Sequence, residues 1–390
     1  MSSEYVGSVE VNVLRTTGEV EQAREEWEAI SSSSSGPTPH PWSDHGYFIE
    51  RLARQPGFVR PHVLMLREGD ARGLLPARIV EERVPWRVGG RRAMSSRARV
   101  LRVANGGLIG LTSQASAEAA VAALLAALSQ GDADLVYLHE LNEASALAAA
   151  ARAAPGLSRD PCPRTAPSYT IDLPGTYEEF FRSRSANTRK AINRARNLTS
   201  RHLAEPIYVR YDSVDGLDRV MADCEAIAAG TYQREIGVGF HDDPQTRDFV
   251  EWALRRGWLH VHVLYDGARP VAFSHMLRYR GTLHLRDTGF DTDYANCRPG
   301  TALLANMIEE ACASFVSERV DYGAMDADYK RQFSNERIGL VSMYLFSPSL
   351  RGQAMRAKRA ATGAADRLAR SVLGAELGRK LSRRIKALRR

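Results

Sequence analysis

The chain has 390 residues, of which 44% are hydrophobic and 25% are charged; this is ordinary for a soluble globular protein and excludes wholesale disorder. The length predicts two or three domains, and we expect two. The 53 basic and 46 acidic residues give a net charge of +7, which suggests an anionic partner.

Hydrophobic patterns in the first half of the chain predict a mixed α/β unit. Residues 8–14 alternate as a half-buried strand does, and residues 20–30 predict a helix followed by a serine-rich loop. Residues 62–84 predict two strands around the turn at Glu68-Gly69-Asp70. The further predicted elements are a strand at 100–109, a helix at 116–128, a short strand at 134–138 and a helix at 143–153.

The second half repeats this order of elements. Its predicted strands are residues 169–173, 259–264, 270–279, 282–289, 319–322 and 340–346. Its predicted helices are residues 177–202, 216–229, 244–256 and 299–317. A Pro- and Gly-rich stretch at 154–167 predicts a domain boundary. We therefore expect an N-terminal unit at 1–165, a C-terminal unit at 166–350 and a basic tail at 351–390.

Cysteine spacing and hydropathy exclude several classes. Cys162, Cys224, Cys297 and Cys312 form no CxxC pair, so we expect neither a disulfide framework nor a metal site, and a reducing compartment. The N-terminus lacks a basic and then apolar signal pattern. The longest apolar run, residues 119–128, is too short to span a membrane. We expect a cytoplasmic protein.

The start of the helix at 299–317 is a candidate anion site. It reads Arg298-Pro299-Gly300-Thr301-Ala302 and follows a predicted strand. A helix N-terminus offers N–H groups and partial positive charge, and glycine lets a diphosphate approach the backbone. The alternative interpretation is an ordinary helix start, because Pro is common at the first helical position.

An ordered series of motifs extends this pattern. The series runs through Gly230–Gln233, Gly237–Phe240, Gly257-Trp258, Pro270–Phe273, Gly289–Asp291, Arg298–Thr301, Asp321–Gly323 and Asp328–Arg331. It resembles the GNAT-like acyltransferases of the FemAB/CelD type, the acetyltransferase 6 group. The resemblance covers roughly residues 169–348, and the first half matches by architecture alone.

The resemblance implies an α/β (α+β) fold of two tandem GNAT-like units, with mixed, mostly antiparallel sheets flanked by helices, plus a basic C-terminal helix. It implies an acyl-CoA donor, acetyl-CoA above all, bound at the helix that starts at Arg298. In the first unit the corresponding helix begins at residues 112–116 without a glycine, so no cofactor is expected there. Family members act on amines of small molecules, sugars, peptides or the cell envelope.

Direct acyl transfer to an amine needs a base, donors for the oxyanion and stabilisation of the thiolate. It needs no nucleophilic residue, and the sequence shows no GxSxG elbow or evident Cys/His pair. Backbone N–H groups of the strand at 282–289 are candidate oxyanion donors. The predicted catalytic side chains are Asp326, His284, Asp287, Tyr329 and Lys330, with Asp328 as a further candidate base.

Other roles for these side chains remain open. Each carboxylate has the alternative of a surface or capping residue, and Lys330 the alternative of pairing with Asp326. Strand alternation places His284 and Arg286 on one face and Asp287 on the other. The predicted acceptor-binding residues are Tyr232, Gln233 and Phe240.

Two segments carry the positive charge. Residues 182–201, which begin and end with Arg182 and Arg201, hold seven basic and no acidic side chains. Residues 351–390, from Arg351 to Arg390, hold 13 basic and 2 acidic side chains, a charge of +11, so the other 350 residues carry −4. Each segment is a candidate surface for an anionic membrane or tRNA, or a solvated helix face that also packs on the protein.

Three functions therefore compete. The first is a CoA-dependent N-acyltransferase. The second is a Fem-type transferase that takes an amino acid from aminoacyl-tRNA, although no pair of long helices predicts the coiled-coil arm that some Fem enzymes carry. The third is a degenerate GNAT fold that serves as a binding module. The sequence favours the first.

Overall fold

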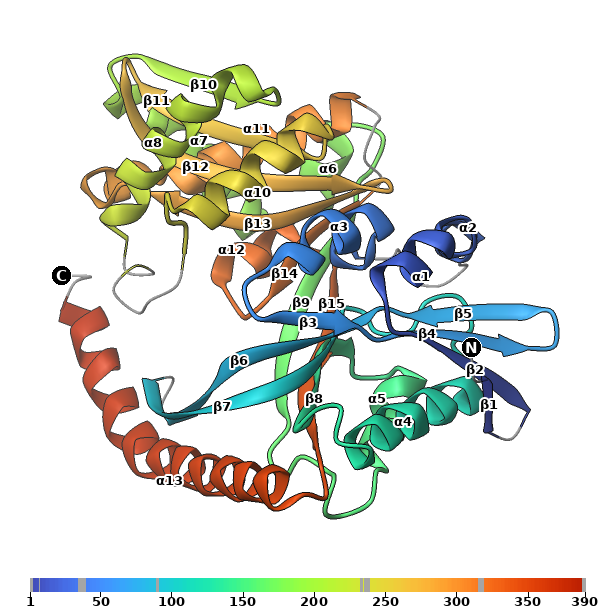
Figure 1. The fold of residues 1–390 in the computed structure, drawn as a ribbon. Helices are drawn as coiled ribbons and strands as arrows, with labels where there is room; N and C mark the ends of the chain where they lie inside the picture. Colours follow the sequence, from blue (N-terminus) through green and yellow to red (C-terminus); the bar gives the residue numbers. More distant parts are fainter. Residues whose placement is uncertain are drawn as a thin grey trace. The chain divides into compact units, whose positions relative to one another are not determined.

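The computed structural model describes residues 3–6, 8–33, 40–88, 91–231, 234, 239–314 and 319–387 (Figure 1). The chain forms two compact units. Unit 1 comprises Met1–Thr165 and Gly339–Arg390, and unit 2 comprises Ala166–Ile338. This division differs from the expected one at its C-terminal side, because residues 339–350 and the tail at 351–390 belong with unit 1.

Unit 1 contains an antiparallel sheet in the order β1-β2-β4-β5 and a second set of strands in the order β15-β8-β7-β6-β3. Its strands are β1 (Ser3–Val6), β2 (Val9–Leu14), β3 (Phe58–Pro61), β4 (Val63–Glu68), β5 (Ala71–Leu75), β6 (Ala77–Val88), β7 (Arg91–Val103), β8 (Leu135–Asn142) and β15 (Glu336–Phe346). Its helices are α1 (Thr17–Gln22), α2 (Arg24–Ser33), α3 (His45–Glu50), α4 (Gln114–Ser129), α5 (Ala146–Arg152) and α13 (Leu350–Ala387), with short 3-10 turns at Pro41–Ser43 and Leu52–Arg54. Its main core packs α4 and α5 against these strands (Figure 1).

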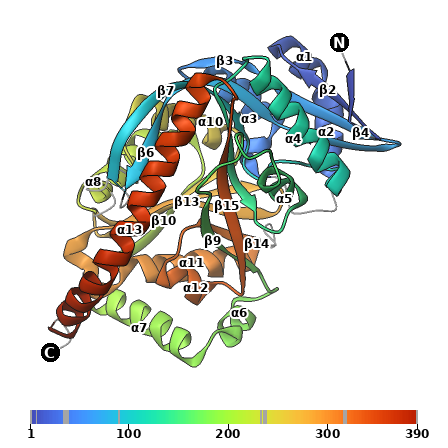
Figure 2. The same ribbon diagram turned by 90° about the horizontal axis from the view of Figure 1, so that it is seen from below.

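The basic C-terminal helix α13 is part of unit 1. Its first half lies along β6 (Figure 2), and Met355 is 2% exposed in that contact. Arg359 pairs with Asp160 at 3.1 Å, and both side chains are almost fully buried. Residues 350–368 are therefore packed as part of unit 1 and do not form a solvated tail.

Unit 2 contains strands in the order β10-β11-β12-β13-β14-β9. They are β9 (Arg164–Asp172), β10 (Pro206–Tyr211), β11 (Leu259–Asp266), β12 (Arg269–Tyr279), β13 (Thr282–Phe290) and β14 (Arg319–Ala324). The helices are α6 (Tyr177–Ser183), α7 (Ala186–His202), α8 (Leu217–Ala229), α10 (Pro244–Arg255), α11 (Pro299–Ser314) and α12 (Asp328–Phe333), with 3-10 turns η3 (Val214–Gly216) and η4 (Thr292–Cys297).

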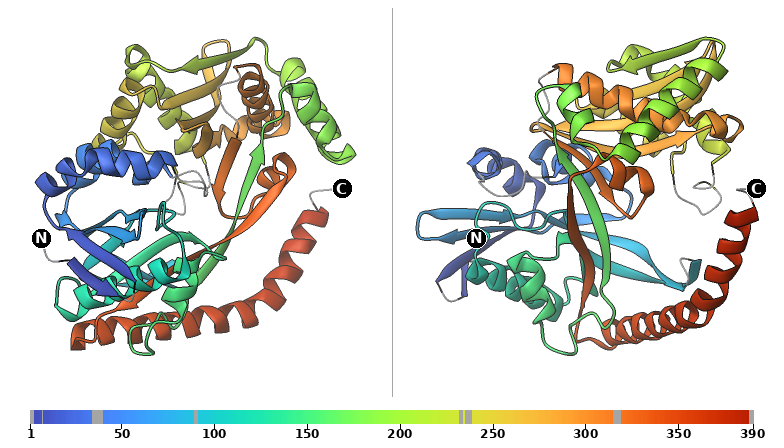
Figure 3. Two further views of the ribbon diagram at one scale, coloured as in Figure 1. Left: turned by 90° about the vertical axis from the view of Figure 1, so that its right-hand side faces the viewer. Right: turned by 180° about the vertical axis from the view of Figure 1, so that it is seen from behind.

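Helices cover both faces of this sheet. α8 and α11 each contact β12, and they do so on opposite faces: Cys224 of α8 contacts His275, whereas Leu303 and Met307 of α11 share a core with Met276. α7 packs against α11 (Figure 3), where Thr199 donates to the Cys297 carbonyl at 3.1 Å. α11 therefore lies between the sheet and α7.

One motif recurs in the two units. In unit 1, β7 and β8 form a parallel pair on either side of α4, with three register positions. In unit 2, β13 and β14 form a parallel pair on either side of α11, also with three register positions. The other strand pairs described within each unit are antiparallel. This confirms the predicted architecture of two GNAT-like units with mixed, mostly antiparallel sheets.

Several elements differ from their predictions. The helix predicted at 177–202 is two helices. α6 ends at Ser183, where Arg184 is extended, and Ser185 caps α7 by accepting from the Thr188 N–H at 3.1 Å. β10 and α12, each of six residues, were not predicted, and α12 is too short to show helical periodicity. No helix in the described residues is long and apolar enough to cross a membrane.

Candidate active site

The sheet of unit 2 opens between β13 and β14. In the described residues their parallel pairing covers only Thr282–His284 against Arg319–Asp321, yet β13 continues to Phe290. Beyond His284, the edge of β13 that faces β14 therefore presents backbone N–H and C=O groups without a β14 partner. These groups are available to a ligand that enters the opening.

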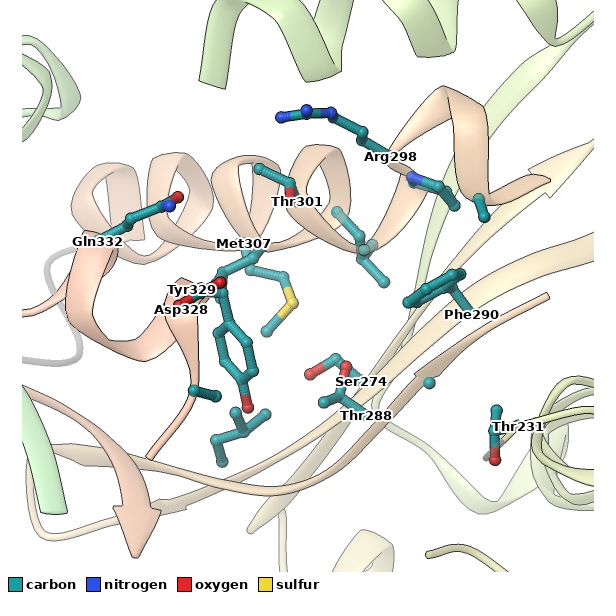
Figure 4. A pocket seen from close by; sticks show the side chains of 18 of the residues that line it. Thr231, Ser274, Thr288, Phe290, Arg298, Thr301, Met307, Asp328, Tyr329 and Gln332 are labelled. Atoms are coloured by element: carbon teal, nitrogen blue, oxygen red, sulfur yellow. The ribbon is translucent and has the colours of Figure 1, made fainter. Parts of the chain in front are cut away.

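A pocket of about 520 Å³ lies at this opening (Figure 4). Residues from β12, β13, η4, α11 and α12 and from the adjoining turns form its walls. They are Thr231, Ser274, Leu285, Thr288, Gly289, Phe290, Thr292, Ala295, Arg298, Pro299, Gly300, Thr301, Leu303, Leu304, Met307, Ala327, Asp328, Tyr329 and Gln332. The interior is mainly apolar, and polar groups stand at the start of α11 and on α12.

The start of α11 forms one end of the pocket. Arg298 takes a left-handed conformation (φ 55°), which turns the chain from η4 into α11, and Pro299 then fixes the first helical residue. A Cβ on Gly300 would lie 3.5 Å from the Phe290 ring, so glycine keeps this wall open. Arg298, Pro299, Gly300 and Thr301 line the pocket, as the donor-site prediction requires, whereas Ala302 is buried in the helix core.

Arg298 and the first turn of α11 form a site suited to an anion. Among the described residues no acidic side chain pairs with Arg298, whose side chain is exposed. The first N–H groups of a helix have no intrahelical acceptor, and the helix dipole adds positive potential. This end of the pocket can therefore bind a diphosphate.

α12 contributes Asp328 and Tyr329, and the Tyr329 side chain projects into the pocket (Figure 4). Its neighbour Lys330 points elsewhere. The Lys330 ammonium is nearly buried and donates to the carbonyls of Gly323 at 3.1 Å and Ala324 at 2.6 Å. Lys330 thus fixes the turn between β14 and α12, and it does not line the pocket.

Asp326 is also held outside the pocket. It accepts a hydrogen bond from the Tyr169 hydroxyl at 2.6 Å and pairs with Arg331, which also pairs with Asp328. These contacts, with Tyr169 first, lower the pKa of Asp326 and weaken it as a base. The observed cation beside Asp326 is Arg331, whereas Lys330 donates to backbone carbonyls.

His284 and Asp287 lie on the face of the sheet away from the pocket. Ser274 and Thr288 are register partners and line the pocket, whereas the next pair, His275 and Asp287, faces the opposite side. A β-bulge at Arg286 shifts the register. His284 and Asp287 therefore share a face, and the prediction from simple alternation was wrong.

On that far face a thiol, an imidazole and a carboxylate lie next to one another in a row. Cys224 Sγ lies 3.5 Å from His275 Nε2, and His275 Nδ1 lies 3.6 Å from Asp287 Oδ2. Sequence reasoning found no such pair, since α8 and β12 are remote along the chain. Cys224 and His275 are both fully buried, and burial raises the pKa of the Cys224 thiol well above its ordinary value. This cysteine is therefore poorly suited to act as a nucleophile.

The predicted acceptor residues are only partly placed. Tyr232 and Gln233 lie outside the described residues, while the preceding Thr231 lines the pocket. Phe240 is 3% exposed and packs on Phe273 and His275, on the far face. Phe240 does not line the pocket.

Sequence reasoning missed much of the pocket wall. Ser274, Thr288, Phe290, Met307 and Gln332 all line it. Alternation along each strand predicts that Ser274 and Met276 share a face of β12, and that Thr288 and Phe290 share a face of β13. Only the pairing of the two strands shows that these residues lie on the same face of the sheet.

Six of the seven basic side chains at 182–201 fall into two sets, and the seventh, Arg182, donates to the Glu178 carbonyl at 3.4 Å. Arg184, Arg189 and Arg196 bond within unit 2, to the Ser334 carbonyl, the Arg184 carbonyl and Glu309 respectively. Lys190, Arg194 and Arg201 are exposed on one side of α7 and pair with no acidic side chain in the described parts of the chain. Asn193 and Asn197 lie between them along a shallow groove. We call these five residues the α7 stripe.

The repeated β–α–β motif, with a sheet that opens at a helix start, defines a protein of the tandem GNAT class. Residues 186–331 match the family model described as acetyltransferase (GNAT) domain, the acetyltransferase 6 family. The matched residues lie within unit 2, and the match supports an N-acyltransferase enzyme of the GNAT type. None of the curated proteins matches the sequence.

Solved structures are similar to this chain at low sequence identity. FemX matches with a TM-score of 0.51 and 8% identity, over 87% of this chain and 97% of FemX. The C-terminal domain of a putative lysylphosphatidylglycerol synthetase from Agrobacterium fabrum matches with a TM-score of 0.49 and 11% identity, over 87% and 96%. A tandem GNAT protein from the clavulanic acid biosynthesis pathway matches with a TM-score of 0.49 and 12% identity, over 87% and 99%.

Proposed function

We propose that the protein transfers an acyl group, acetyl in the first instance, from acyl-CoA to an amine. The observation that carries this proposal is the pocket of unit 2, an apolar channel that ends at Gly300 and Arg298. A CoA thioester has the matching shape, with a diphosphate at one end of an uncharged arm. The acceptor belongs to the class of small-molecule, sugar, peptide or cell-envelope amines.

The proposed reaction is direct. The amine attacks the thioester carbonyl, so that a C–N bond forms and the C–S bond breaks. Backbone N–H groups on the open edge of β13 stabilise the oxyanion. The amine proton passes to Asp328, the predicted carboxylate that lines the pocket, and the leaving thiolate takes a proton from the Tyr329 hydroxyl.

A second donor is supported by a separate observation. The α7 stripe presents three cations and two amides, and none of the acidic side chains that the structure describes pairs with these cations, which suits a phosphate backbone. This feature supports the Fem-type alternative, in which aminoacyl-tRNA replaces acyl-CoA.

Thermal-shift titration of the whole protein separates these donors. We expect acetyl-CoA to raise the melting temperature with a saturable dose response, and uncharged RNA of tRNA length to have no such effect. Stabilisation by aminoacyl-tRNA but not by CoA would replace the proposed donor with the second one. Stabilisation by neither would support a degenerate GNAT fold that acts as a binding module.

The proposed location is the cytoplasm, with contact to the inner face of the membrane through the C-terminal part of α13. Residues 369–390 carry eight basic and one acidic side chain, with leucines and an isoleucine between them. A basic amphipathic helix of this kind binds anionic lipid surfaces.

A further inference from the structure

Ser274 has a hydroxyl group that the fold leaves without a partner. It lies on β12 and is 3% exposed, and its Oγ forms no hydrogen bond with any described residue. Buried polar groups in folded proteins are almost always paired, so each exception indicates a missing partner. Ser274 lines the donor pocket of unit 2, so the missing partner is expected in that pocket.

The Ser274 hydroxyl is surrounded by apolar side chains and by a hydroxyl that is already hydrogen-bonded. Its register partner Thr288 donates to the Phe273 carbonyl at 3.0 Å and is thereby satisfied. Leu303 and Met307 of α11 line the same pocket, and Met307 projects into it on the side of Ser274 (Figure 4). Methionine is flexible, so a ligand can displace it and reach Ser274.

The position of Ser274 along the pocket indicates which part of the donor it meets. Phe290 lies against Gly300 at the anion-binding end, and Thr288 stands two residues earlier on β13, a distance of about 7 Å. Tyr329, the proposed proton donor, lies on the opposite side of Ser274 and Thr288 from Phe290 (Figure 4). Ser274 therefore faces the middle of a ligand whose diphosphate binds at Gly300.

We propose that Ser274 binds a secondary amide in the arm of the donor, and thereby selects a pantetheine-type arm. This inference rests on the proposed acyl-CoA function. A serine hydroxyl can donate to an amide carbonyl or accept from an amide N–H, and both groups occur in that arm. The ribose–phosphate chain of a tRNA presents no amide at this depth.

The test compares three ligands and three proteins by calorimetric titration. The ligands are CoA, pantetheine and adenosine 3′,5′-diphosphate, which has the nucleotide but no arm. The proteins are the wild type, Ser274→Ala and Ser168→Ala. Ser168 is a matched control, because it is 3% exposed in the same unit but its hydroxyl donates to Asp321 at 3.4 Å and does not line the pocket.

We expect Ser274→Ala to weaken CoA and pantetheine binding by the same factor, roughly threefold to tenfold, and to leave adenosine 3′,5′-diphosphate binding unchanged. The melting temperature of ligand-free Ser274→Ala should not fall, since no hydrogen bond of the fold is lost. Ser168→Ala should melt lower and bind CoA normally.

Three results would overturn the assignment. If Ser274→Ala binds CoA and pantetheine as the wild type does, Ser274 does not contact the arm. If the variant loses affinity for adenosine 3′,5′-diphosphate by the same factor as for CoA, the effect of Ser274 is not specific to the arm. If the wild type binds neither CoA nor pantetheine, the proposed donor is wrong, and the role of Ser274 is rejected with it.

Discussion

At the residue scale, Gly300 is the position where the proposed donor would approach the start of α11. The sequence indicated this position from its Pro-Gly helix start alone. The structure adds that a side chain there would meet the Phe290 ring at ordinary contact distance, so the fold tolerates a larger residue. Gly300 is thus a position where a substitution can block the ligand without disturbing the backbone.

We predict that Gly300→Glu abolishes CoA binding and leaves the melting temperature nearly unchanged. A carboxylate in the first turn is compatible with the helix dipole but repels a diphosphate at close range, which lowers affinity by about two orders of magnitude. Calorimetric titration measures the loss. Gly156→Glu, with the same charge change in an open loop of unit 1, should bind CoA normally. Unchanged CoA affinity in Gly300→Glu would contradict the assigned site.

Tyr329 is the predicted catalytic residue whose hydroxyl the structure directs into the pocket. We predict that Tyr329→Phe lowers kcat about a hundredfold and changes the KM for acyl-CoA little, because only protonation of the thiolate is lost. Steady-state kinetics with acetyl-CoA and an amine acceptor provide the measurement. In Tyr169→Phe, which loses a hydroxyl that bonds Asp326 outside the pocket, the decrease should be much smaller. Equal decreases in the two variants would exclude a special role for Tyr329.

At the element scale, the sequence predicted most helices and strands but not how their faces meet. The periodicity of α8, with Val220, Cys224 and Ile227 buried on one side, is visible in the sequence and confirmed. The bulge at Arg286 is not visible, since it depends on the pairing of β13 with β12. His284 and Asp287 were predicted as catalytic from their residue types, and alternation placed them on opposite faces. The bulge instead puts both on the face away from the pocket.

The turn that precedes α12 shows why a lysine can resemble a catalytic residue. Lys330 stands in the family motif, but its ammonium bonds two backbone carbonyls. We predict that Lys330→Met destabilises unit 2 by about 2–4 kcal/mol, because buried carbonyls lose charged donors. Urea unfolding measures the change, and Lys190→Met on the exposed side of α7 is the control. A stable but inactive Lys330→Met would assign Lys330 to catalysis instead.

At the scale of the whole molecule, buried histidines make stability depend on pH. Burial lowers the pKa of His62 to about 4 and of His262 to about 3, from an ordinary value of 6.5. The unfolded chain therefore takes up protons below pH 6.5 that the folded chain does not, so stability falls as the pH falls.

We predict a decrease of about 2 kcal/mol per such histidine between pH 7 and pH 5, a range above the ordinary titration of carboxylates. Chemical unfolding at several pH values measures this slope. His262→Asn should flatten it, whereas His202→Asn, on the exposed end of α7, should not. A slope that His262→Asn leaves unaltered would show that other groups cause it.

The positive charge of α13 is spread over two parts of the helix that have different roles. From the sequence, residues 351–390 looked like one basic tail. The structure shows that the first half is held by Met355 and by the buried Arg359–Asp160 pair. A deletion from residue 349 would therefore remove part of the core of unit 1, and a test of the charged segment has to keep residues up to 368.

We predict that a chain ending at Leu368 folds with nearly the melting temperature of the full chain and loses its binding to anionic vesicles. Residues 369–390 carry a charge of +7, and each cation near an anionic surface contributes about 1 kcal/mol. Co-sedimentation with phosphatidylglycerol vesicles, and with phosphatidylcholine vesicles as the neutral control, measures the difference. If both chains sediment equally with anionic vesicles, the membrane contact lies elsewhere. If the full chain sediments with neither vesicle but the truncation weakens tRNA binding, the charge of α13 serves nucleic acid and the proposed membrane location is wrong.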